Sequence, residues 1–154
     1  MAEQFQTAGP HLIFAVICER VLLEADGVAS LIRVVDRFNI QGPTETMPPT
    51  TLSLWIAILF KAGAYRGPAR IGVQPVSPSG RELPALNMPV NFEGDDDRGV
   101  LVTLQAYFTV EETGLYWFDV SLSERPVTRI PLRVAYLPIQ TKAYGEPPPG
   151  TQQS

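Results

Sequence analysis

The chain has 154 residues, of which 45% are hydrophobic and 18% are charged, and its formal net charge is −4. The hydrophobic fraction excludes a wholly disordered chain, and the length fits one domain around a single core. The positive residues are scattered singly, so the sequence lacks the basic stripe that contacts nucleic-acid phosphates, and we expect no nucleic-acid partner.

The apolar runs are too short to cross a membrane. The run at residues 12–18 is far below the roughly 20 residues that a bilayer requires, so we expect no membrane contact. Residues 1–7 lack the basic start of a signal peptide, and the one cysteine, Cys18, has no partner for an intramolecular disulfide. We therefore expect a cytoplasmic protein.

Fifteen prolines and twelve glycines lie mostly between apolar runs, which is typical of short strands joined by turns. The pattern predicts eight strands, at residues 12–23, 28–40, 51–60, 70–76, 82–92, 100–108, 115–122 and 127–137. The first two should form a hairpin, because Asp26 and Gly27 between them favour the positive φ angles of a tight reversal. No run of 12 or more residues has a convincing helical period, so the chain is predicted to be all-β.

Alternation is clearest in the last three predicted strands. In residues 115–122, Tyr116, Phe118 and Val120 share one face while Trp117 and Asp119 take the other. Such half-buried strands indicate an antiparallel sheet with one face in water. The first strand differs, because it is apolar on both faces from residue 12 to residue 17 and needs cover on both sides.

The spacing of Glu112, Gly114, Tyr116 and Phe118 matches a tyrosine corner, the turn that enters a late strand of an immunoglobulin-like sandwich. We predict an antiparallel immunoglobulin-like β-sandwich of about eight strands over residues 11–138. Residues 1–10 should be loose, and residues 139–154, which contain three consecutive prolines, should form a disordered or extended tail.

Three segments in this order resemble an uncharacterised bacterial family of short β-sandwich proteins of unknown function. They are an opening LIFA strand at residues 12–15, the segment RIGVQPVSPSGRE at residues 70–82, and a closing G-x-Y-x-F-x-V strand at residues 114–120. The resemblance covers residues 12–137 and implies a fold without an activity, so it brings no functional residues. Val16 departs from the family, whose members often carry an acidic residue after the alanine.

The residues that carry chemistry do not form a catalytic pattern. His11 is the only histidine and has no accompanying zinc ligands, and Cys18 lies in an apolar strand where a buried, inert thiol is expected. Neither a Gly-x-Ser-x-Gly elbow nor a phosphate-binding glycine loop occurs. We therefore expect no enzyme and no cofactor.

One carboxylate cluster, Glu93 with Asp95, Asp96 and Asp97, is a candidate calcium loop. Consecutive aspartates cannot all face one ion, and a second acidic loop is missing, so a solvated loop between strands is the favoured interpretation. A module that binds calcium or a small ligand through its end loops remains the alternative function.

Three large side chains fall out of phase with the predicted core. Trp117 and Leu115 alternate with Tyr116 and Phe118, and Trp55 alternates with its apolar neighbours in residues 51–60. Outward tryptophans on a sheet mark a possible partner surface, unless loops or the tail cover them. The sequence therefore favours a non-enzymatic sandwich that acts by protein contact, as a homo-oligomer or an accessory subunit.

Overall fold

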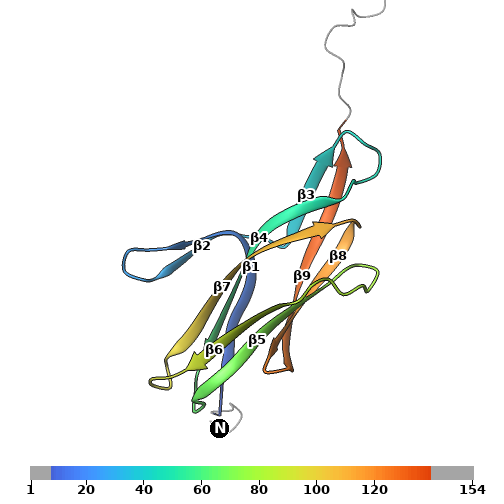
Figure 1. Cartoon of the computed structure of the whole chain (residues 1–154). Helices are drawn as coiled ribbons and strands as arrows, with labels where there is room; N and C mark the ends of the chain where they lie inside the picture. The colour runs from blue at the N-terminus through green and yellow to red at the C-terminus, as the bar shows by residue number, and fades with distance from the viewer. Residues whose placement is uncertain (1–7, 140–154) are drawn as a thin grey trace, which may run out of the picture.

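A computed structural model describes residues 8–139, and this part of the chain forms two β-sheets (Figure 1). Residues 8–139 contain no helix, and therefore none that could span a membrane. The prediction of an all-β protein is confirmed, with nine strands in place of about eight.

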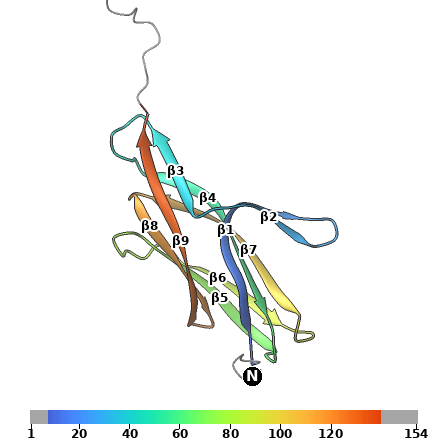
Figure 2. The same ribbon diagram turned by 180° about the vertical axis from the view of Figure 1, so that it is seen from behind.

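The nine strands divide into a four-stranded sheet, in the order β2-β1-β4-β7, and a five-stranded sheet, in the order β3-β9-β8-β5-β6. Figure 2 shows the same two sheets from behind. The strands are β1 (His11–Leu23), β2 (Ala29–Val34), β3 (Arg37–Gly42), β4 (Thr50–Lys61), β5 (Gly67–Val76), β6 (Leu86–Phe92), β7 (Gly99–Val110), β8 (Gly114–Leu122) and β9 (Arg125–Pro138).

The predicted strand at residues 28–40 was wrong, because two strands in different sheets occupy this segment. Between β2 and β3 the backbone N–H of Val35 donates to Ile17 at 2.9 Å, and Asp36 accepts from the backbone N–H of Arg133 at 2.9 Å. The chain thus leaves one sheet and joins the other within two residues. Arg33, with a φ of 55°, bends the strand just before this crossing.

The predicted antiparallel arrangement also needs a correction. β3 pairs with β9 in parallel, from Arg37↔Arg133 to Gly42↔Pro138, whereas every other strand pair is antiparallel. This pairing joins an early strand to the last one, so no local sequence pattern could indicate it.

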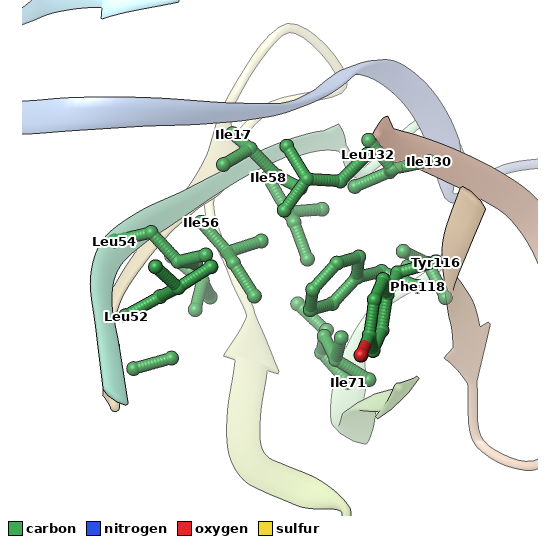
Figure 3. Packing of buried hydrophobic residues seen from close by; sticks show 14 of the residues in the cluster. Ile17, Leu52, Leu54, Ile56, Ile58, Ile71, Tyr116, Phe118, Ile130 and Leu132 are labelled. Carbon is green, nitrogen blue, oxygen red and sulfur yellow. The ribbon is translucent and has the colours of Figure 1, made fainter. Parts of the chain in front are cut away.

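The core lies between the sheets and is built from alternate residues of each (Figure 3). Leu54, Ile56 and Ile58 of β4 face Tyr116 and Phe118 of β8, and each of these side chains is at most 1% exposed. Burial of one such side chain contributes about 1.5–3 kcal/mol to folding. The alternation therefore fixes which face of each sheet points outward.

The tyrosine corner is confirmed. The Tyr116 hydroxyl donates to the carbonyl oxygen of Glu112 at 2.8 Å, and burial raises the pKa of this hydroxyl. The Glu112 carboxylate accepts a hydrogen bond from Ser79 at 2.9 Å, and bonds from Ser79 and Ser77 lower the pKa of the carboxyl. The corner therefore ties the β7–β8 turn to the loop after β5.

The β1–β2 hairpin projects away from the two sheets (Figures 1 and 2). Its turn is the predicted one, since Gly27 has a φ of 84° and donates its N–H to the carbonyl oxygen of Glu24 at 2.9 Å. Beside the turn, Leu23 is 74% exposed and Val28 is 60% exposed. The hairpin thus carries apolar side chains into water.

The predicted loose segment at residues 1–10 and the predicted tail at residues 139–154 fall almost wholly outside the described residues. Only residues 8–10 and Ile139 of these segments are described.

Candidate protein-contact surface

The outer face of the four-stranded sheet combines a group of apolar side chains with uncharged polar ones, which are Thr51, Ser53, Thr103, Gln105 and Thr109. Directly paired residues of an antiparallel sheet point to the same side, so the neighbours of an outward residue are also outward. Because Ile56 and Ile58 point into the core, Trp55, Ala57 and Leu59 of β4 point out of it. Their paired neighbours on both sides extend this outer surface across the sheet.

Three rows of paired residues make up most of this surface. Leu59 pairs with Phe14 and Leu101, Ala57 pairs with Val16 and Thr103, and Trp55 pairs with Cys18 and Gln105. Together with the outward residues of β2 and Tyr107 of β7, they form what we call the apolar face: Phe14, Val16, Cys18, Ile32, Val34, Trp55, Ala57, Leu59, Leu101 and Tyr107.

Water reaches the parts of the apolar face on β2 and β7, whereas Cys18 and Ala57 at its centre are fully buried. Tyr107 is 67% exposed, Val34 is 60% exposed, and Ile32 and Leu101 are each 39% exposed. Of the outward positions on these four strands, only Arg20 and Lys61 are charged. The centre of the face therefore carries no charge that a partner would have to neutralise.

Cys18 lies within this face but is fully buried beside Trp55. Burial raises the pKa of the Cys18 thiol, which keeps it in its unreactive protonated form at neutral pH. The prediction of a buried thiol is confirmed, and Trp55 is its paired neighbour on β4.

The outer face of the five-stranded sheet carries charged side chains among its apolar ones. The guanidinium of Arg129 lies over the Trp117 ring, 4.7 Å from its centroid, and also forms an ion pair with Asp119 at 2.6 Å. Leu115 is paired with Arg133 on the neighbouring strand. Trp117 is thus partly covered by its own sheet.

The structure does not bring the three predicted partner residues together. Trp55 lies on the outer face of the four-stranded sheet, and Trp117 and Leu115 lie on that of the five-stranded sheet. All three side chains are half-buried. Sequence reasoning missed the exposed Tyr107, although its alternation with the buried Ala106 placed it outward.

The acidic loop between β6 and β7 is partly occupied by internal contacts. Arg66 donates to the Asp96 carboxylate at 2.8 Å, and the backbone N–H of Arg98 donates to the carbonyl oxygen of Asp95 at 2.9 Å. Within residues 8–139, no three histidine, cysteine, aspartate or glutamate side chains gather as metal ligands. His11 pairs with Lys61 at the start of β1, and Lys61 in turn pairs with Gly99, which directly follows this loop.

Comparison with family models gives one match, to a family of unknown function, DUF6941, over residues 13–135. The chain belongs to this family. The matched residues of this DUF6941 chain include β2 to β8 and most of β1 and β9, so the family corresponds to both sheets together. No curated protein matches the chain.

Proposed function

We propose that this DUF6941 protein is a non-enzymatic β-sandwich that acts through protein contact, and that a second copy of the chain binds its apolar face. The observation that carries the proposal is the difference between the two outer faces. The five-stranded sheet carries charged residues such as Asp119, Arg129 and Arg133 on its outer face, whereas Trp55, Leu101 and Tyr107 belong to a surface whose centre is uncharged and largely apolar.

The size of the apolar face suits a dimer. Strands lie about 4.8 Å apart and rise about 3.4 Å per residue, so β1, β4 and β7 over about ten residues cover roughly 490 Å². The hairpin of β1 and β2 beyond Cys18, two strands over about five residues, adds roughly 160 Å². A stable interface buries about 800 Å² of each partner. On the projecting β1–β2 hairpin, Leu22 is 41% exposed and points to the same side as Ile32, which supplies further apolar area beside the face.

A two-fold dimer would place the same face of both copies in contact, and this arrangement is the commonest for homo-oligomers. The chain carries a net charge of −4, so contact between acidic surfaces would be unfavourable. The apolar face avoids this repulsion because its outward positions include no aspartate or glutamate.

The test compares two tryptophans on opposite faces. We expect the wild-type protein to have the mass of a dimer at micromolar concentration, measured by size-exclusion chromatography with light scattering. Trp55→Ser should yield a monomer, and the matched control Trp117→Ser should remain a dimer. A wild-type monomer up to about 100 µM would contradict the proposal, since interfaces of standard size bind in the range from micromolar to picomolar.

Trp55 is also the paired neighbour of the buried Cys18, so its removal could unfold the protein. Val34→Lys provides a second variant, because Val34 is 60% exposed on the same face and its replacement leaves the core intact. A folded Val34→Lys protein that keeps the dimer mass would place the interface elsewhere.

The immunoglobulin-like class and the cytoplasmic location belong to this proposal. The tyrosine corner supports the former, and the single, unpaired Cys18 supports the latter. Calcium binding by Asp95, Asp96 and Asp97 is the weaker alternative, because Asp96 is already held by Arg66. Isothermal titration with calcium chloride tests it directly.

A further inference from the structure

The two sheets have four edge strands, and three of these carry features that hinder pairing with another chain. β6 has Pro89 in its middle, and proline cannot donate to a neighbouring strand. β3 and β2 have six residues each, and each carries an exposed arginine, Arg37 and Arg33. The left-handed backbone of Arg33 further distorts the end of β2.

The fourth edge strand, β7, has none of these features. Its 12 residues, GVLVTLQAYFTV, include no charged residue and no proline. It pairs with β4 at every position from Thr50↔Val110 to Lys61↔Gly99 without a register shift, and its other side has no strand partner among residues 8–139. A long, regular and uncharged edge is the kind of strand that recruits a further strand.

We infer that the free edge of β7 binds an extended apolar segment of a partner protein, which adds a fifth strand to the four-stranded sheet. On the core side of β7, Leu104 and Phe108 are only partly buried and would contact alternate side chains of the added strand. On the outer side of the sheet, Leu101 and Tyr107 would contact those side chains of the added strand that point outward. The segment should therefore be apolar on both faces.

The acidic residues at both ends of β7 indicate which charge the bound segment should carry. Glu93, Asp95 and Asp97 precede the strand and outnumber the single Arg98 beside them, and Glu111 and Glu112 follow it. Of these positions, Glu111 is paired with Arg81 at 3.3 Å. A segment with lysine or arginine at both ends would complement this charge.

The same charges disfavour a second β7 as the added strand. Antiparallel pairing of two β7 strands would bring the acidic loop before one strand next to Glu111 and Glu112 of the other. The inference thus concerns a different protein, whereas the proposed dimer concerns the apolar face.

The test uses a synthetic peptide of alternating valine and leucine, which is apolar on both faces, with two lysines at each end, and a control peptide with glutamates in place of the lysines. The lysine peptide should bind the wild-type protein about tenfold more tightly, as judged by fluorescence titration. Amide hydrogen exchange of the wild-type complex should show new protection confined to residues 99–110.

Gln105→Lys with Thr109→Lys should weaken binding about tenfold, because both residues are exposed on β7 and the new charges repel the peptide. Asn87→Lys with Asn91→Lys on β6 is the matched control and should bind as the wild type does. The inference would be overturned if both peptides bound equally well, or if the new protection appeared on another edge strand. It would also be overturned if the β7 amides of the free protein were already protected by self-association. If the wild-type protein were a monomer, only the proposed dimer would be contradicted, and the inference about the β7 edge would stand.

Discussion

The Tyr116 hydroxyl holds the turn between β7 and β8, where the chain passes from one sheet to the other. Its ring is 1% exposed and lies 6.1 Å from the ring of Phe108, so one side chain serves both the core and the turn. The spacing to Glu112 is local, which is why the sequence alone predicted this contact.

Two substitutions separate the contribution of the Tyr116 hydroxyl to the turn from that of its ring to the core. Tyr116→Phe keeps the ring and loses the hydrogen bond, so the free energy of unfolding should fall by about 0.5–1.5 kcal/mol. Tyr116→Ala also leaves a cavity in the core and should cost about 3–5 kcal/mol. Urea denaturation measures both values, and a loss below about 1 kcal/mol for the alanine variant would contradict the role of Tyr116 in the core.

The raised pKa of Tyr116 predicts a loss of stability at high pH. Unfolded tyrosine ionises near pH 10, before the buried hydroxyl does, so the contribution of Tyr116 is complete below about pH 10 and declines above it. The difference in unfolding free energy between the wild type and Tyr116→Phe should therefore shrink between about pH 8 and pH 11. A constant difference would mean that the hydroxyl ionises equally in both states.

Trp117 illustrates what residue patterns do not reveal. Alternation with Tyr116 and Phe118 placed it outward, which agrees with the structure. The Arg129 guanidinium that covers it comes from the neighbouring strand. Since strand register depends on pairing across the whole sheet, this cover could not be read from the local sequence.

The β1–β2 hairpin is the least supported element of the four-stranded sheet. β2 occupies the sheet edge and pairs with β1 alone. Two-stranded hairpins are only marginally stable in water, so this element needs support from outside its own two strands. A second copy on the adjoining apolar face would provide it.

Hydrogen exchange tests this dependence. In dilute protein, amides near the hairpin turn between Leu22 and Ser30 should exchange much faster than those of the central strand β4. At concentrations that favour the dimer, exchange in the hairpin should slow. Slow exchange at every concentration would indicate that the hairpin is stable within one chain.

Strand positions were predictable to within a few residues at most sites, because apolar runs and proline- or glycine-containing turns are local signals. The division of residues 28–40 was not predictable. It depends on the positive φ of Arg33 and on the pairing of β3 with the distant β9. Neither has a sequence signal, since arginine is not a residue that favours positive φ.

At the scale of the molecule, the two outer faces predict how stability depends on concentration. Dimerisation through the apolar face stabilises the folded state by mass action, so the midpoint of thermal unfolding should rise with protein concentration. Trp55→Ser should abolish this rise, and Trp117→Ser should preserve it. Differential scanning calorimetry over a hundredfold range of concentration measures the effect. A midpoint independent of concentration in the wild type would argue against association.

The position of β9 also constrains the order in which the molecule can be completed during translation. β9 lies between β3 and β8, inside the five-stranded sheet, and is the last strand of residues 8–139. All strands of the other sheet have been synthesised by Val110. A nascent chain can therefore assemble the four-stranded sheet while β3 still lacks the strand it pairs with, and only the emergence of Pro138 from the ribosome allows the second sheet to close over the core.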